Sequence, residues 1–579
     1  MLEIIRKLFS LLNVRQKRDF LILQVLMILT ALTELIGVAS ILPFMALAAD
    51  PGLVTSNEYL NRVYLLTGEP DPGVFLVWSG SVFIFLIFLA NGLLLVSQFF
   101  MNRYSHRLGG EFSVSIYDYY LRRDVIFHSR ENSATLTQHV MRDTLRLSTH
   151  LIAPVLRLNA RVFSIFLLSS LIIFVDVRVA VTTLVCFVLV YWFVFYSLRT
   201  RIYRNGQNIS AYDATRYKML NESFEGIVDI KLYGAESQLV KQFAASTRKV
   251  ARSLADNMIM GQSPYYLVET LVLVGTLLIT LYFISIKGTI ESVLPVLTLY
   301  VMAGFKLAPK IQQSYLAITQ IRSAQPVFHS LYAVLRKASE SLVLDEPSVD
   351  AMYPGQAIEL RDVSYAFPGE QSPVLKNVSL HVDVGSVVAI TGQSGSGKST
   401  MLDILMGLIS PDKGGIYIDG DDIDRSQLRS WQRAVGFVPQ FTYLSDTSIA
   451  ENIAFGLPAE EIDLERVKIA ARQAEIAEFI EELPQRYDTR IGERGTLLSG
   501  GQRQRLGIAR ALYREISVLV LDEATSSLDN ETQQQIFSNL KANETNLTII
   551  MVTHREETLH YADHLYELRE GMLSRVSSA

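Results

Sequence analysis

A glycine-rich run that ends in lysine and serine carries the clearest chemistry in this sequence. It spans residues 392–400 and places Lys398 and Ser399 directly after its last glycine. Glycines let backbone N–H groups wrap around phosphates, while the lysine reaches the β- and γ-phosphates and the hydroxyl holds Mg²⁺. The pattern predicts a nucleotide-binding loop for ATP and Mg²⁺. Its expected binding residues are Gly392, Gln393, Ser394, Gly395, Ser396, Gly397, Lys398, Ser399 and Thr400.

Two adjacent carboxylates form the second candidate for chemistry. Asp522 and Glu523 follow the four apolar residues 518–521, about 120 residues after the loop. A carboxylate at this place can coordinate Mg²⁺ directly or through water, and the next one can polarise an attacking water as a general base. We therefore expect Asp522 and Ser399 to hold the metal and Glu523 to be catalytic.

Strands of a parallel sheet must position both groups. Residues 387–390 are apolar and precede the loop, and residues 401–405 are typical of the helix that follows it. Residues 518–521 read as a buried strand, and ligands bind at the C-terminal edge of such sheets. The long interval between loop and carboxylates leaves room for an inserted subdomain. The C-terminal part is therefore predicted to be an α/β P-loop domain with a helical subdomain.

A third motif lies between the two, at residues 498–505, with the sequence Leu-Ser-Gly-Gly-Gln-Arg-Gln-Arg. A serine and two glycines at a helix start make another phosphate cradle. The run resembles the signature motif of ABC ATPases. That resemblance implies that this motif closes on the γ-phosphate bound by a partner subunit. The residues concerned are Ser499, Gly500, Gly501 and Gln502.

Further positions match the same family in order along the chain. Phe367 stands where an aromatic ring stacks on adenine, although tyrosine is commoner there. Gln440 matches the glutamine that contacts Mg²⁺ and the membrane domain, and residues 526–529 match the D-loop. His554 matches the switch histidine that contacts the γ-phosphate. The resemblance thus implies catalytic roles for Glu523 and His554 and a metal-contacting role for Gln440.

The first half of the chain has a different composition. Hydrophobic residues make up 49% of the sequence and charged residues 19%, and the apolar excess lies between residues 20 and 320. Six stretches are long enough, or nearly so, to cross a bilayer as helices. They are 20–48, 74–101, 155–175, 178–198, 264–286 and 291–317. Arginines and lysines before the first stretch and after the second and fourth place those loops in the cytoplasm.

Composition excludes several other classes. The net charge of −5 argues against a nucleic-acid partner. Cys186 is the only cysteine, so the chain has neither a disulfide framework nor a thiolate metal site. The N-terminus is amphipathic and basic, and we expect a short interfacial helix there rather than a secretory signal.

We predict a transmembrane domain at 1–325, a linker at 326–354 and a nucleotide-binding domain at 355–579. The inner loops 102–154 and 199–263 are long, which indicates membrane helices with long cytoplasmic extensions. We expect these helices to turn at 133–143 and at 219–236, or else to be plain solvated helices. The outer segment 50–72 has helical spacing and reads as a short surface helix or a structural cap.

The domain order resembles that of ABC exporters, in which two half-transporters operate as a dimer in the membrane. No catalytic position is degenerate, so a homodimer needs no different partner. Residues 41–45 and 300–309 resemble bacterial flippases for lipid-linked oligosaccharides. That resemblance implies ATP-driven flipping of a polyprenyl-pyrophosphate glycolipid across the bacterial inner membrane. Other lipids, peptides or drugs stay open as substrates. A non-transporting channel or sensor is a further alternative, which retention of Glu523 disfavours.

Charged residues inside the spans bear on the substrate, because such charges are expensive and usually functional. Four of them form two pairs, each at a spacing of four, so that each pair lies on one helix face. They are Arg157 and Arg161 in the third predicted span and Lys306 and Lys310 in the sixth. They either reach the interface or pair with the acids Glu34 and Glu269, or they line a basic cavity for an anionic headgroup.

Overall fold

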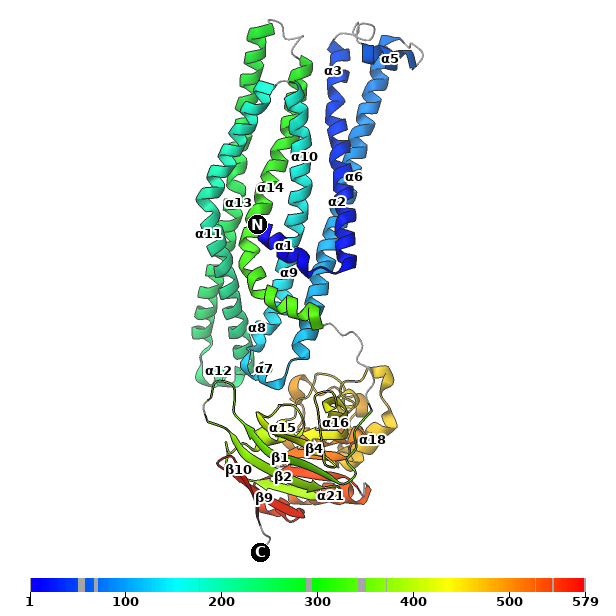
Figure 1. Cartoon of the computed structure of the whole chain (residues 1–579), viewed down its shortest axis with the longest axis vertical. Coiled ribbons are helices and arrows are strands. Elements are labelled where there is room, and N and C mark those ends of the chain that lie inside the picture. The colour runs from blue at the N-terminus through cyan, green and yellow to red at the C-terminus, as the bar shows by residue number, and fades with distance from the viewer. Residues whose placement is uncertain are drawn as a thin grey trace. The chain divides into compact units, whose positions relative to one another are not determined.

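The computed structural model describes residues 2–49, 58–66, 71–175, 177–287, 294–341, 350–370, 372–525, 527–543 and 546–576. The chain divides into two compact units. The first comprises Met1–Arg123 and Phe127–Leu344, and the second comprises Asp124–Ile126 and Asp345–Ala579. The described part of the first unit is helical, and the strands belong to the second (Figure 1). The prediction of a helical membrane domain followed by an α/β domain is confirmed.

Long helices lying side by side build the first unit (Figure 1). Within the described residues, α2 continued by α3, together with α6, α10, α11, α13 and α14, makes six long helical segments. The elements are α1 (Leu2–Leu11), α2 (Val14–Ala39), α3 (Ile41–Ala49), α5 (Glu58–Leu66), α6 (Pro72–Leu121), α7 (Val125–Arg130), α8 (Ser133–Gln138), the π-helix η1 (His139–Asp143), α9 (Thr144–Leu147), the π-helix η2 (Ser148–Ile152), α10 (Ala153–Val175), α11 (Val177–Glu225), α12 (Ile227–Tyr233), α13 (Glu236–Lys287) and α14 (Leu294–Ser341).

Three helical stretches among the described residues are long and apolar enough to cross a membrane. They are Val14–Ala48, Gly73–Leu121 and Ser133–Phe174, and they contain the first three predicted spans. On α6, Phe88 is 75% exposed and Leu95 is 70% exposed. Apolar side chains this exposed on a long helix suit a hydrocarbon solvent rather than water. The other three predicted spans fall on α11, α13 and α14, and the last of them, 291–317, begins at residues outside the described set.

Close helix contacts and buried ion pairs hold the inner ends of these helices together. A side chain at Gly206 of α11 would collide with the carbonyl oxygen of Ser323 on α14, so only glycine permits this approach. Asp213 of α11 is almost fully buried and accepts Arg142 of η1 at 2.7 Å and Arg216 at 3.2 Å. These contacts fix α11 against its neighbours well below the apolar stretch.

Two expectations about the first unit need revision. The first inner turn was expected at 133–143, but the chain reverses between Arg122 and Asn132, around α7. Asn132 caps α8 through its side chain, which accepts Ala134 N–H at 2.9 Å, so residues 133–143 already belong to the returning helix. The second turn lies where it was expected, at α12. The segment expected to be a linker begins as helix, because α14 continues to Ser341 and buries Phe328.

The expected terminal and outer helices are both present. Residues 2–11 form α1, whose apolar face packs into the core with α6 and α14 instead of lying free. Residues 58–66 form α5, while the rest of the outer segment 50–72 lies largely outside the described residues.

The second unit contains two sheets. One has the strand order β2-β1-β4-β5 and the other β10-β9-β3-β8-β7-β6, with β9, β3, β8, β7 and β6 parallel. The strands are β1 (Ala357–Tyr365), β2 (Leu375–Asp383), β3 (Val387–Thr391), β4 (Lys413–Ile418), β5 (Asp421–Asp422), β6 (Val435–Val438), β7 (Val518–Asp522), β8 (Thr548–Val552), β9 (His564–Arg569) and β10 (Met572–Val576). The helices are α15 (Lys398–Leu405), α16 (Leu428–Ala434), α17 (Ile449–Ile453), α18 (Leu464–Gln473), α19 (Ala477–Glu482), α20 (Gly500–Tyr513), α21 (Asn530–Asn543) and α22 (Glu556–Leu559).

Successive side chains of the central strands face two different hydrophobic cores, which explains the continuous apolar runs in these strands. On β7, Leu519 and Leu521 face one hydrophobic core, and Val518 and Val520 face the other. Successive side chains of a strand point to opposite faces, so a strand covered on both faces has no polar positions. The first core also contains the helices inserted between loop and carboxylates. The predicted helical subdomain is therefore present.

Candidate functional site

The phosphate-binding loop connects β3 to α15, as the sequence predicts. Gly397 has φ +105° and is the N-cap of α15, and a Cβ there would lie 2.9 Å from Leu375 Cδ2. A side chain at Gly392, where φ is +148°, would collide with the Leu568 carbonyl oxygen. Both positions therefore require glycine. The loop's backbone N–H groups and the start of α15 make an anion cradle.

Two polar side chains of the loop fit a phosphate ligand. Lys398 is buried, and its Nζ donates to the carbonyl oxygens of Gly392 at 2.6 Å and Gln393 at 2.9 Å. Burial lowers the pKa of Lys398, although Glu523 and Asp522 act against that shift. The hydroxyl of Ser396 is buried without a hydrogen-bond partner among the described residues. The loop thus holds a cation and an unpaired donor that a phosphate oxygen would satisfy.

The residues expected to hold Mg²⁺ lie together. Ser399 Oγ donates to Asp522 Oδ2 over 3.1 Å, and Asp522 ends β7 directly beside β8. Burial raises the pKa of Asp522, and the Ser399 hydrogen bond opposes that rise. A hydroxyl and a carboxylate are the hard oxygen ligands that Mg²⁺ takes alongside phosphates. The donor set fits the metal, which when bound neutralises charge on the phosphate oxygens.

Glu523 lies at the centre of a second small cluster. Its carboxylate accepts Gln440 Nε2 at 2.8 Å and lies 3.4 Å from His554 Nε2. Its backbone has φ +49°, a left-handed conformation that is unfavourable for a residue with a side chain, and its N–H donates to Val552 O. The structure thus brings together Glu523, predicted to activate water, His554, predicted to contact the γ-phosphate, and Gln440, predicted to contact Mg²⁺. A general base must stand within hydrogen-bond reach of the water that it polarises.

One acidic residue near Asp522 was not predicted from the sequence. Asp403 lies one turn into α15, and burial followed by repulsion from Asp522 raises its pKa to about 6. The sequence feature that could have indicated Asp403 is its position five residues after Lys398, on the helix that follows the phosphate-binding loop.

The signature residues form a separate group. Ser499 caps α20 in a reciprocal capping box, with Ser499 N–H donating to Gln502 Oε1 at 2.8 Å and Gln502 N–H to Ser499 Oγ at 3.3 Å. A Cβ on Gly501 would lie 3.1 Å from the carbonyl oxygen of Ser527, in the D-loop. Among the described residues, no hydrogen bond or ion pair joins this group to the phosphate-binding loop.

Phe367 and the D-loop are the two remaining predicted positions of this unit. Phe367 lies two residues beyond β1, half-buried, with its ring edge-on to Tyr365 at 5.3 Å between centroids. Ser526, the first residue of the predicted D-loop, lies outside the described residues. Gln504 Oε1 accepts the backbone N–H of Ser527 at 3.0 Å and so ties the D-loop to the signature helix.

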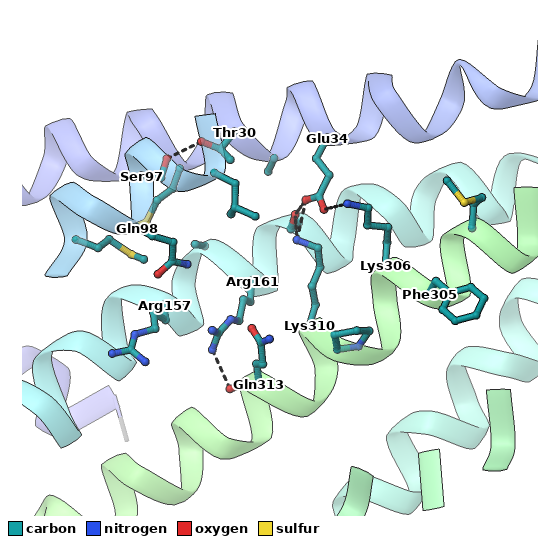
Figure 2. Close-up of a pocket in the computed structure, with 18 residues that line it drawn as sticks. Thr30, Glu34, Ser97, Gln98, Arg157, Arg161, Phe305, Lys306, Lys310 and Gln313 are labelled. Carbon is teal, nitrogen blue, oxygen red and sulfur yellow. Dashed lines mark hydrogen bonds and ion pairs between the residues drawn. The ribbon is translucent and has the colours of Figure 1, made fainter. Parts of the chain in front are cut away.

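The first unit holds a cavity of about 400 Å³ between α2, α6, α10 and α14 (Figure 2). All four basic residues predicted as substrate ligands line it. The lining residues are Met27, Thr30, Ala31, Glu34, Leu94, Ser97, Gln98, Met101, Arg157, Ala160, Arg161, Ser164, Met302, Phe305, Lys306, Pro309, Lys310 and Gln313.

The two lysines of this cavity share one carboxylate. Glu34 of α2 is buried and lies 2.7 Å from Lys310 Nζ and 3.8 Å from Lys306 Nζ (Figure 2). Ser164 donates to Glu34 at 3.0 Å and accepts from Lys310 at 3.1 Å. The expected pairing of basic residues with an acid thus holds for Lys306 and Lys310. Ser164 was missed, although it lies three residues after Arg161 on the same helix.

The two arginines have no such counter-ion. Arg161 Nη1 donates to the Gln313 carbonyl oxygen at 2.9 Å, and Arg157 Nε is buried without a partner. No described carboxylate lies within ion-pair distance of either guanidinium, and Glu269, on α13, is exposed outside the cavity. Four cations against one carboxylate leave the lining with three positive charges in excess, and two of these belong to the arginines.

A phosphate-binding loop, a metal pair, a water-activating carboxylate and a signature helix, fused to long apolar helices, define a membrane-bound ATPase. The sequence matches the family described as ABC transporter over residues 375–526 and the one described as ABC transporter transmembrane region over residues 58–260. The chain belongs to the ABC transporter family and has the exporter arrangement of domains. It is a membrane protein that uses ATP with Mg²⁺ to drive transport.

Several known proteins are similar to this chain. An "ATP-dependent lipid A-core flippase" of Salmonella typhimurium is 28% identical over 520 residues, which cover 87% of this chain and 86% of that protein. The chloroplastic "ABC transporter B family member 29" of Arabidopsis thaliana is 32% identical over 391 residues, or 65% of this chain and 59% of that protein. A solved bacterial Atm1-family ABC exporter with ATP bound has a TM-score of 0.77 at 23% identity, covering 97% of this chain and 95% of the other.

Proposed function

We propose that two copies of this chain form an ATP-driven flippase for a glycolipid with a phosphate-bearing headgroup. The observation that carries the proposal is the cavity whose arginines, Arg157 and Arg161, lack a counter-ion. A half-buried cation inside a membrane domain is unfavourable without an acid, unless a ligand supplies the negative charge. Guanidinium groups suit phosphate because they donate in a planar fork.

The chemistry of the lining fits an amphipathic substrate. Apolar side chains such as Met27, Leu94 and Phe305 share the cavity with the arginines. The name of the Salmonella relative points to a lipid A-core glycolipid, and the segments at 41–45 and 300–309 point to a lipid-linked oligosaccharide pyrophosphate. Both carry phosphate on a lipid-anchored sugar. The bacterial inner membrane is the proposed location, because there both ATP and such lipids are available.

The separation of the signature from the phosphate-binding loop supports a homodimer. Gly501 approaches Ser527 in the D-loop of its own chain, and the phosphate that Ser499 is proposed to contact would be bound by the loop of a second copy. Exposed apolar side chains on α12 also call for a partner, since Val228 is 75% and Tyr233 is 78% exposed in the single chain. Because no catalytic position is degenerate, an identical copy completes both sites.

The test measures flipping in proteoliposomes that contain either lipid A-core glycolipid, polyprenyl-pyrophosphate oligosaccharide or a neutral glycolipid. The variant Arg157→Gln/Arg161→Gln should lose flipping of the phosphorylated lipid. Lys306→Gln/Lys310→Gln should lose less, because both ammonium groups already pair with Glu34, which balances one of their two charges. Arg199→Gln is the matched control, since Arg199 is exposed on α11 and stacks on Tyr196 outside the cavity.

Each outcome has a defined meaning. Flipping of one phosphorylated lipid only would assign the substrate, and equal flipping of both would assign the shared headgroup chemistry. Equal flipping of the neutral glycolipid, or full activity of the arginine variant, would refute the role of the arginines. Equal losses in the arginine and lysine variants would show that total charge, and not the unpaired guanidinium groups, determines transport.

A further inference from the structure

A second basic pocket lies on helices that the cavity does not use. It is a groove of about 720 Å³ between α11 and α13, which run side by side in the first unit (Figure 1). Its lining residues are Leu198, Arg201, Arg204, Asn205, Asn208, Arg252, Asp256, Ile259 and Met260. The transport cavity is lined by α2, α6, α10 and α14, so the two pockets share no residue.

Three guanidinium groups converge on this groove from two helices. Arg201 and Arg204 are one turn apart on α11, and Arg252 faces them from α13. Asp256 is the one acid of the lining, and no ion pair within 4.0 Å joins it or any other carboxylate to these arginines in the described part of the chain. The groove therefore has a net positive charge that the protein does not balance.

Along each helix of the groove, the apolar lining residues lie nearer to the predicted span than the arginines do. On α11, Leu198 ends the predicted span 178–198, and the arginines follow it. On α13 the order is reversed, with Arg252 first and then Ile259 and Met260 just before the predicted span 264–286. Both helices thus place apolar side chains toward the bilayer and arginines on the cytoplasmic side. A ligand that fits this gradient has an anionic head and an apolar tail.

We propose that the α11–α13 groove binds an anionic glycerophospholipid of the inner leaflet, with its phosphate between Arg204 and Arg252. The lipid bridges two helices and screens three like charges, so its binding stabilises the folded membrane unit. Nothing in this proposal depends on what the central cavity transports. Inorganic phosphate shares the headgroup chemistry but lacks the tail, and the experiment separates the two.

The experiment uses the full-length protein in a neutral detergent and measures binding by native mass spectrometry and by the thermal unfolding midpoint. The probes are phosphatidylglycerol, phosphatidylcholine and inorganic phosphate. Arg204→Gln/Arg252→Gln should weaken phosphatidylglycerol binding about tenfold or more, since each arginine provides a charge-assisted hydrogen bond. Arg199→Gln removes one arginine from the same helix α11 but outside the groove, and it should bind as the unmodified protein does.

A second variant moves affinity in the opposite direction, which misfolding cannot imitate. Asp256→Asn removes the one negative charge of the lining and should tighten phosphatidylglycerol binding several-fold. Equal weakening by Arg199→Gln would overturn the proposal, because it would show a general effect of surface charge. Phosphatidylcholine binding as tightly as phosphatidylglycerol would overturn the anionic specificity. Equally tight inorganic phosphate would assign a site for soluble anions instead of a lipid.

Discussion

The substitution Glu34→Gln tests how the cavity of the membrane unit distributes its charge. Glu34 is 7% exposed, and its carboxylate forms ion pairs with Lys310 and Lys306 and accepts a hydrogen bond from Ser164. Glutamine keeps the size and one acceptor oxygen but removes the negative charge. Two ammonium groups would then face each other and the arginines without compensation.

The size of the effect follows from burial. Removing one partner of a buried ion pair costs about 3–5 kcal/mol, because the other charge stays buried and unpaired. The Lys310 side chain is 15% exposed to a cavity that admits water, so we expect the lower end, about 3 kcal/mol. Adding Lys310→Gln removes the stranded charge and should restore about 2 kcal/mol, within the usual range of coupling between contacting residues.

The assay compares thermal unfolding of the unmodified protein, Glu34→Gln, Lys310→Gln and the double variant in one detergent. Glu269→Gln serves as the control, because this acid is exposed on α13 and should shift stability by less than about 0.5 kcal/mol. Glu34→Gln should also lower the concentration of phosphorylated glycolipid that half-saturates stimulated ATP hydrolysis, since the lining gains one unit of positive charge. Additive losses in the double variant would refute the reasoning, as would a control that destabilises as much as Glu34→Gln.

Three further predictions concern the ATPase unit. Glu523→Gln should bind ATP but hydrolyse it at least ~10²-fold more slowly, and an ATPase rate equal to that of the unmodified protein would remove Glu523 from the mechanism. Mixed dimers of Lys398→Ala and Ser499→Arg chains contain one intact composite site and should recover hydrolysis that neither homodimer shows, while full activity of either homodimer would contradict a shared site. The hydrogen bond that His381 donates to the Glu359 carboxylate raises the pKa of His381. The contribution of this pair to stability is therefore complete below the unfolded value of about 6.5 and is lost as pH rises through the folded value. His381→Asn should therefore lose more stability relative to the unmodified protein at pH 6 than at pH 9, and a pH-independent difference would exclude the linkage.

The architecture of the ATPase unit follows closely from its sequence, because local patterns determine it. Glycines that are required for backbone space, as at Gly392 and Gly397, can be recognised directly in the sequence. A strand buried on both faces, such as β7, can be recognised as a continuous apolar run. No comparable sequence pattern indicates that Asp403 belongs to the site. Its raised pKa arises from the fold, which brings it beside Asp522 more than a hundred residues later.

The membrane unit was less predictable, since apolar composition fixes a helix but not its neighbours. The first inner turn was misplaced because Ser133–Gln138 is as compatible with a turn as with the helix that Asn132 caps. The spacing of Arg157 and Arg161 indicated a shared helix face. Which acid would pair with which cation required the arrangement of α2 against α10 and α14, and no local pattern encodes that arrangement.

In the cavity and in the α11–α13 groove, lysines and arginines differ in whether a carboxylate of the protein pairs with them. Lysines meet the protein's own carboxylate at Glu34, where a compact ammonium group needs only proximity. Arginines stand where no acid compensates them, both at Arg157 and Arg161 in the cavity and at Arg204 and Arg252 in the α11–α13 groove. Guanidinium groups stay charged even when partly buried, and they are less strongly hydrated than ammonium groups. An arginine site without a carboxylate therefore has a lower desolvation penalty, before a phosphate binds, than a lysine site would have. Both proposed lipid sites require this property.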